Sequence, residues 1–196
     1  MSLASITLIL FLIMDPLGNV AYFIEVLSHI PPQQQKWVII REMFIALGVM
    51  ILFYIIGDLI LDFLEVSDAS VSLTSGTILF LVAIKIIFPN SRNSRLQARA
   101  DSEPFIVPLA IPLIAGPAML ATILLFSHKF GPLVVIPILI AWFLASMVLI
   151  FSRYLMKALG RNGLIAIERL MGMILILLAI QRFLEGINYF VEALNG

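Results

Sequence analysis

The sequence contains no cysteine. This absence excludes disulfide frameworks, thiolate metal sites and thiol relays, and it leaves the redox compartment open. Charge is also scarce, because Asp, Glu, Lys and Arg make up 12% of the 196 residues, against about 25% in an ordinary soluble domain. With 62% hydrophobic residues, the composition excludes a water-soluble globule.

The motifs of several functional classes are missing as well. There is no H-E-x-x-H pair, phosphate-binding glycine loop or nucleophile elbow, so we expect neither an enzyme nor a bound cofactor. No basic stripe with interleaved aromatic residues indicates nucleic acid. His29 and His128 end predicted half-helices at opposite faces, so they are not expected to share a metal.

Long apolar runs dominate what is present. About 20 apolar residues cross a bilayer core as a helix, and six runs reach or approach that length. We therefore predict an all-α polytopic membrane protein whose single integral membrane domain covers residues 1–196, with connections that include residues 31–36 and Lys157–Gly163. The predicted spans are Leu3–Leu27, Met43–Leu64, Val71–Phe88, Phe105–Phe126, Leu133–Leu155 and Leu170–Val191.

Cationic residues gather on one side of the predicted bundle. Loops one, three and five, with the adjoining span ends, hold ten of the twelve Lys and Arg residues, and the other side holds Lys129 and Arg182. The positive-inside rule therefore predicts odd loops in the cytoplasm and both termini outside. The ten are Lys36, Arg41, Lys85, Arg92, Arg95, Arg99, Arg153, Lys157, Arg161 and Arg169.

The two halves of the chain resemble each other. Residues Gly76–Ile84 align with Gly172–Ile180 at an offset of 96, with six of nine positions identical, and the same offset aligns Pro16 with Pro112. Chance similarity between apolar helices is the alternative. Three spans per half make the predicted repeats inverted, a plan found in many secondary transporters. The predicted divisions are repeat one over about residues 1–89, a cytoplasmic loop over about 90–103 and repeat two over about 104–196.

Two predicted spans contain residues that interrupt a helix near the midplane. In span one, the run Asp15-Pro16-Leu17-Gly18-Asn19 removes a backbone donor at proline and permits non-helical torsions at glycine. Span four carries Ala115-Gly116-Pro117, and Pro117 suits the first position of a new helix. Each new helix would present unpaired N–H groups and the positive end of its dipole, which receive carboxylates. The alternative is a proline kink satisfied by neighbouring helices.

Asp15 is the most informative single residue. A carboxylate at the centre of a span costs about 2.5–3.5 kcal/mol on insertion scales, and such residues usually face a cavity or a partner. A carboxyl group that exchanges a proton there would couple transport to protons, so Asp15 is the predicted proton-coupling residue. The compatible alternative is that Asp15 caps the helix beginning near Asn19.

Other polar residues complete the predicted site. Arg41 with Glu42 and Glu168 with Arg169, at the cytoplasmic starts of spans two and six, form a predicted gate, and snorkelling anchors are the alternative. Most hydroxyl groups at depth are expected to bond back to their own helix. The predicted substrate-binding residues are Asp15, Pro16, Gly18, Asn19, Ala115, Gly116, Pro117, Thr77 and Thr122.

Three motifs resemble the MarC family of bacterial inner-membrane proteins. They are Met14-Asp15-Pro16-Leu17-Gly18-Asn19, the run Glu103–Pro117, and Glu168-Arg169-Leu170-Met171-Gly172. The resemblance covers essentially the whole chain. It implies six transmembrane helices, a multi-pass location in the bacterial inner membrane, and proton-coupled transport of small neutral amino acids.

Three functions are therefore compared. The leading hypothesis is a secondary transporter for a small zwitterion such as glycine, alanine, serine or threonine. A second is a non-transporting membrane interaction protein whose broken helices pack a partner. A third, drug or metabolite efflux, needs a larger aromatic-lined cavity than the spread of the 14 Phe residues suggests. The expected partners are the solute and membrane lipid, and the sequence leaves the exact substrate, flux direction and a homo-oligomer open.

Overall fold

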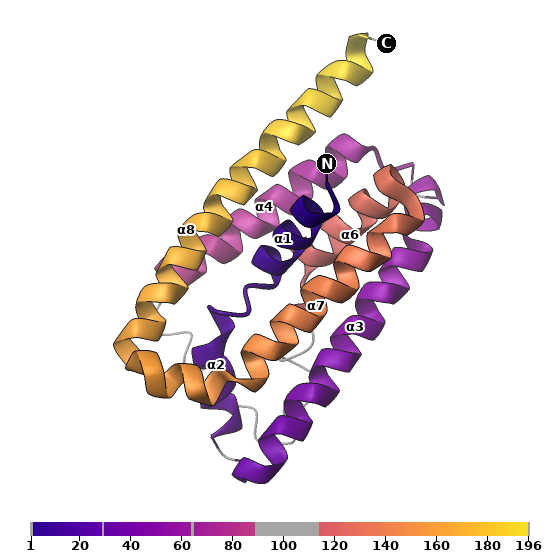
Figure 1. The fold of residues 1–196 in the computed structure, drawn as a ribbon. Coiled ribbons are helices and arrows are strands. Elements are labelled where there is room, and N and C mark those ends of the chain that lie inside the picture. The colour runs from indigo at the N-terminus through magenta and orange to yellow at the C-terminus, as the bar shows by residue number, and fades with distance from the viewer. Residues whose placement is uncertain (1, 29, 64, 89–113, 196) are drawn as a thin grey trace.

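Residues 2–28, 30–63, 65–88 and 114–195 are described in the computed structural model of the protein. Every element of regular structure in these ranges is helical, which confirms the predicted all-α class. The elements are α1 (Leu3–Met14), α2 (Asn19–Leu27), α3 (Pro32–Phe63), α4 (Asp68–Ile87), α6 (Pro117–Phe130), the 3-10 helix η2 (Gly131–Val134), α7 (Val135–Ile150) and α8 (Ser152–Asn195) (Figure 1).

Four helical stretches among the described residues are long and apolar enough to cross a membrane. α1 and α2, bent by 46° at a short break, add a fifth if the pair is counted as one span. Within the stretch Pro117–Ile150, Gly131 leaves helical torsions, with φ of 60°, and begins the 3-10 helix that separates α6 from α7. The predicted six-span count also depends on residues before Ile114, which lie outside the described ranges. The four stretches are Gln33–Gly57, Asp68–Ile87, Pro117–Ile150 and Ser152–Leu194.

Two predicted connections are more helical than expected. α3 begins at Pro32, so the polar residues after it form the first helical turn, where the missing N–H of proline is not needed. The predicted connection Lys157–Gly163 lies within α8 at a kink where two helices meet, because Gly160 leaves helical torsions there, with φ of 65° and ψ of 175°. The leucine, lysine, alanine and arginine residues around Gly160 favour helix, while glycine accepts the positive φ.

The two ends of the bundle can be assigned from contacts between helix ends. At one end, Arg153 Nε in α8 donates a hydrogen bond to Gln35 Oε1 in α3 at 3.0 Å. At the other end, Lys129 of α6 lies 3.6 Å from Asp68 of α4 and over the ring of Tyr189 in α8. Both chain termini lie toward this second end (Figure 1). The connections that follow predicted spans one and five thus lie at one end of the bundle, and those that follow spans two and four lie at the other end.

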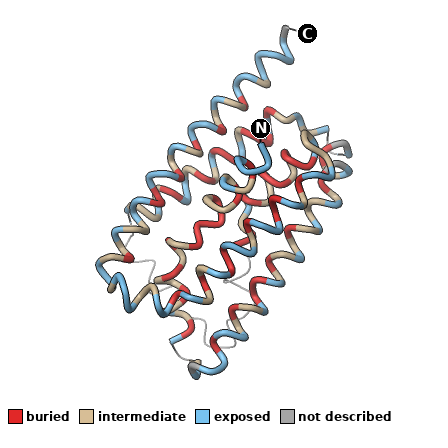
Figure 2. The backbone as a smooth tube through the Cα atoms, viewed as in Figure 1, coloured by how far each residue is buried: buried red, intermediate tan, exposed pale blue. Residues whose placement is uncertain are grey.

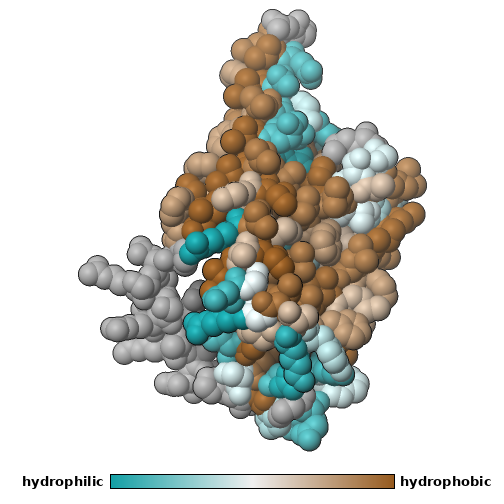
Figure 3. All heavy atoms as spheres, turned by 60° about the vertical axis from the view of Figure 1, so that its left-hand side comes forward, coloured by the Kyte–Doolittle hydropathy of each residue, from teal (hydrophilic) through white to brown (hydrophobic). Residues whose placement is uncertain are grey.

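Large apolar side chains cover the outside of the bundle. Phe63, Leu59 and Leu177 expose 83%, 72% and 68% of their surface, and Figure 3 shows apolar atoms over most of the face that it displays. Buried residues instead follow the inward sides of the helices (Figure 2). An exposed apolar surface of this extent marks a membrane-facing surface rather than a water-facing one.

Candidate functional site

The chain leaves helical geometry between α1 and α2. α1 ends at Met14, and Asp15 follows in the left-handed conformation, with φ of 44° and ψ of 54°. α2 begins at Asn19. A left-handed residue other than glycine costs on the order of 1–3 kcal/mol and is concentrated at functional sites. The predicted interruption is therefore confirmed over residues 15–18, while Asn19 already belongs to the new helix.

The Asp15 side chain is buried inside this break. It exposes 5% of its surface, and its Oδ1 accepts a hydrogen bond from the backbone N–H of Gly18 at 3.1 Å. Gly18 directly precedes α2, so Asp15 holds the residue before this helix, while the first turn of α2 has no side-chain cap. Asn19 holds the break from the other side, because its Nδ2 donates to the carbonyl oxygen of Met14 at 3.0 Å. Among the described residues, nothing donates a hydrogen bond to Asp15 Oδ2.

Gly18 leaves the space that the Asp15 carboxylate fills. A Cβ atom built on Gly18 would overlap that carboxylate, with its Cγ only 2.8 Å away. The φ of Gly18 is −64°, which alanine adopts without strain. The atoms nearest to that Cβ all belong to the Asp15 carboxylate.

We expect Gly18→Ala to destabilise the protein by about 1–3 kcal/mol, because it displaces Asp15 and leaves a buried polar group unpaired. In an Asp15→Ala background the same change should be nearly neutral, since the overlap is gone. Reversible unfolding of the four proteins in mixed micelles measures this coupling. Equal destabilisation by Gly18→Ala in both backgrounds would contradict the assigned packing.

The second predicted break begins α6. Ile114 and Ala115 are buried, Gly116 is extended with ψ of 167°, and Pro117 is the first helical residue, as predicted. Residues before Ile114, including Pro108 and Pro112, lie outside the described residues, so a mirror-image break of span four stays a prediction. Ile114 and Ala115 join Met14 in one hydrophobic cluster, which means that both breaks border the same core.

The predicted hydroxyl ligands separate in the structure. Thr122 is fully buried in α6, where its hydroxyl donates to the Ala118 carbonyl at 2.8 Å and lies 3.2 Å from Ser75 Oγ of α4. Thr77 is exposed on α4 and bonds back to Leu73 at 2.8 Å. The structure therefore brings Thr122 into the core and leaves Thr77 on the outer surface.

The four predicted gate residues occupy different environments. Glu42 is fully buried and accepts two hydrogen bonds from its neighbour Arg41, at 3.1 and 3.0 Å. Glu168 is half-buried in α8. Arg169 is exposed. Arg41 and Glu42 thus pair with each other, and ion pairing between the two predicted halves of the gate stays a prediction.

Arg182 was assigned to the outer-side cations, and the structure buries it within the bundle. It exposes 4% of its surface, donates from Nη1 to Glu185 Oε2 at 2.9 Å and lies 4.7 Å from the Phe126 ring centroid. Its Nη2 has no hydrogen-bond partner among the described residues. The available signal was its position well inside the predicted span Leu170–Val191, where a cation is costly and marks a functional site.

The apolar outer surface, the long helices and the charged residues buried among them define a polytopic helical membrane protein. Comparison with known sequences specifies it further, because the profile described as "MarC family integral membrane protein" matches residues 1–191. The chain belongs to the MarC family, which confirms the resemblance inferred from the motifs. No solved structure matches it.

Named relatives are similar over nearly their full length. An "UPF0056 membrane protein" of Buchnera aphidicola is 47% identical, over 94% of this chain and 95% of the relative. The "UPF0056 inner membrane protein YhgN" of Escherichia coli is 46% identical, over 96% and 97%. A Chlamydia pneumoniae relative, also an "UPF0056 membrane protein", is 30% identical, over 95% and 94%. With its apolar helices, the chain is a multi-pass inner-membrane protein, and these names state no substrate.

Proposed function

We propose that this chain is a secondary transporter of small neutral amino acids, coupled to protons through Asp15. The observation that carries the proposal is the buried Asp15 carboxyl group at a helix break, with one oxygen bonded to Gly18 and the other without a donor among the described residues. A substrate ammonium group would pair with that second oxygen. Intramembrane acids in such positions mark transport pathways and proton relays.

The substrate carboxylate would be received by the helix starts that border the same core. α6 begins at Pro117, and the first N–H groups of a helix have no intrahelical acceptor. These groups carry the positive end of the helix dipole, so they attract an anion. A small zwitterion would therefore find a partner for each of its charges.

The proposed mechanism is alternating access between two three-span repeats. Asp15 is 5% exposed, so the described conformation is closed around it. The proposed six-span inverted arrangement, with both termini outside, allows one repeat to move against the other and opens the site to each side in turn. Glu168 and the Arg41–Glu42 pair would then form part of the cytoplasmic gate.

Counterflow tests the proposal. Proteoliposomes loaded with unlabelled alanine should transiently accumulate external labelled alanine, whereas protein-free vesicles should not. The assay needs no imposed gradient and works for import or export. Exchange of none among glycine, alanine, serine and threonine would support the interaction-protein hypothesis instead, and exchange of bulky apolar drugs alone would support efflux.

The proposed orientation predicts a labelling pattern for single-cysteine variants. The chain has no cysteine of its own, so each introduced thiol is the only target. Ser70→Cys, exposed near the Asp68 end of the bundle, should react with an impermeant maleimide in intact cells. Gln34→Cys, exposed near the Arg153 end, should react only after permeabilisation. The reverse pattern would overturn the ten-to-two charge argument.

A further inference from the structure

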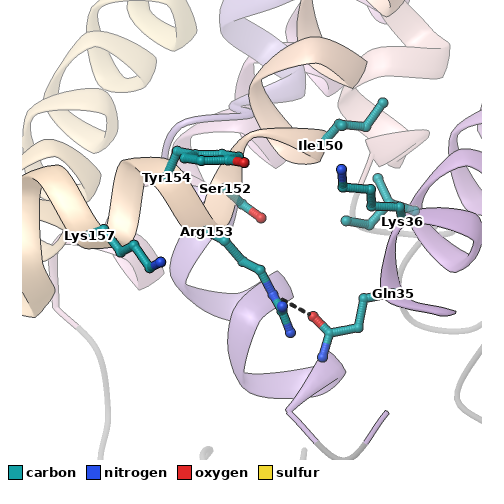
Figure 4. Close-up of a pocket in the computed structure, with 8 residues that line it drawn as sticks. Gln35, Lys36, Ile150, Ser152, Arg153, Tyr154 and Lys157 are labelled. Carbon is teal, nitrogen blue, oxygen red and sulfur yellow. Dashed lines mark hydrogen bonds between the residues drawn. The ribbon is translucent and has the colours of Figure 1, made fainter. Parts of the chain in front are cut away.

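A cavity of about 220 Å³ lies between the start of α3 and the junction of α7 with α8, and none of its lining residues belongs to the proposed transport site. Three cations line it, with Lys36 contributed by α3 and Arg153 and Lys157 by α8 (Figure 4). Lys36 and Lys157 lie on opposite sides of the space, and Ser152 points its hydroxyl group between them (Figure 4). No Asp or Glu is among its lining residues.

The polar wall of this cavity is built by fixed side chains. Gln35 is buried, and its Nε2 donates to the carbonyl oxygens of Leu27 and Ile30, both at 2.7 Å. Its Oε1 accepts the Nε–H of Arg153 at 3.0 Å. Every polar atom of the Gln35 amide group is therefore engaged, and the bond fixes the Arg153 guanidinium with its terminal nitrogens left for another acceptor.

The three cations lack a carboxylate partner in the described part of the chain. Its side-chain ion pairs join Arg41 to Glu42, Lys129 to Asp68 and Arg182 to Glu185. A guanidinium beside two ammonium groups and a hydroxyl matches the several acceptor oxygens of a phosphate group. The cavity thus has the charge and shape to hold an anion, and no carboxylate in the described part of the chain takes that place.

The surroundings of the cavity favour a phosphate that is attached to a lipid. Ile39 and Ile150 form its apolar wall. Tyr154, which is 63% exposed, lines the cavity, and Trp37, which is 73% exposed, follows Lys36 in α3. Such aromatic residues mark the headgroup level of a bilayer. Basic pockets between transmembrane helices on the cytoplasmic side bind anionic headgroups.

We propose that this cavity binds the phosphate headgroup of an anionic phospholipid. The site stands on the lining of the cavity and on the Gln35–Arg153 bond, so it does not depend on the transport proposal. Bound lipid would link the start of α3 to the start of α8, two segments that belong to different predicted repeats.

Lipid binding to the purified protein tests the site by native mass spectrometry across a titration of phosphatidylglycerol. The Lys36→Gln, Lys157→Gln double variant should bind phosphatidylglycerol more weakly, by about fivefold for each lysine. It leaves the Gln35–Arg153 bond intact, so the fold should be kept. Arg161→Gln is the matched control, because it removes an exposed cation of α8 that does not line the cavity.

Three outcomes would overturn the proposal. Equal loss in the Arg161→Gln control would show general charge attraction rather than a site. Equal binding of phosphatidylcholine by the unaltered protein would remove the preference for an anionic headgroup. Displacement of phosphatidylglycerol by equimolar inorganic phosphate would assign the cavity to a soluble anion rather than to a lipid.

Discussion

Asp15→Asn should abolish the accumulation of alanine driven by a pH gradient, while the protein still inserts and folds. The amide keeps an oxygen for the Gly18 N–H, and asparagine tolerates the left-handed torsions that Asp15 adopts. It does not exchange a proton, so the coupling step is lost. The measurement is uptake of labelled alanine by proteoliposomes with and without the gradient, compared with protein-free vesicles.

Asp68→Asn is the matched control for this substitution. Asp68 is a partly exposed acid that pairs with Lys129 at the end of the bundle, far from the break. The Asp68→Asn protein should retain the accumulation of alanine that the pH gradient drives. Unchanged proton-coupled transport in Asp15→Asn would leave Asp15 with a purely structural role at the break. A loss of folded protein would be detected before the transport assay, as a changed elution profile in size-exclusion chromatography.

Removal of the substrate carboxylate should cost far more than a change in the apolar side chain. A site whose buried polar groups are left unpaired discriminates against a ligand by a factor of about 10⁴–10⁵. One methylene group changes binding by only about 1–3 kcal/mol, which is a factor of about 10–200. Alanine should therefore compete well for labelled alanine transport, while alaninamide, ethylamine and lactate should compete poorly. The measurement is inhibition of uptake or efflux over a concentration series of each compound.

Ethylamine and lactate separate the two halves of the proposed recognition. Ethylamine keeps the ammonium group that would pair with Asp15, and lactate keeps the carboxylate that would meet the helix starts. Competition by ethylamine as strong as that by alanine would contradict the carboxylate assignment. Serine and glycine, which keep both charges, should stay within the range that one small side-chain change allows.

Local sequence patterns predicted the helical class and the position of the first break. Hydrophobic run length determines where helices cross a bilayer, and proline with glycine at residues 16 and 18 predicts where one stops. Pro117 likewise predicted the start of α6. These features depend on residues that are close together in the chain, so a single sequence contains the necessary information.

Features that depend on distant segments were not predicted. The Gln35–Arg153 bond joins residues 118 positions apart, and the burial of Arg182 follows from packing of α8 on α4 and α6. Thr77 and Thr122 look alike in sequence, yet helix rotation exposes one and buries the other. In a membrane protein, hydrophobicity does not determine how a helix is rotated about its axis, since lipid-facing and core-facing residues are both apolar.

The distance between bound alanine and Asp15 tests the central claim most directly. Solid-state NMR on protein in lipid, with ¹⁵N-labelled alanine and ¹³C-labelled aspartate side chains, measures it by dipolar dephasing. We expect the alanine nitrogen to lie about 4 Å from one aspartate carboxyl carbon, as in an ion pair, and this signal to vanish in Asp15→Asn. Dephasing that persists in Asp15→Asn, or bound alanine with no aspartate carboxyl group nearby, would contradict the proposed transport site.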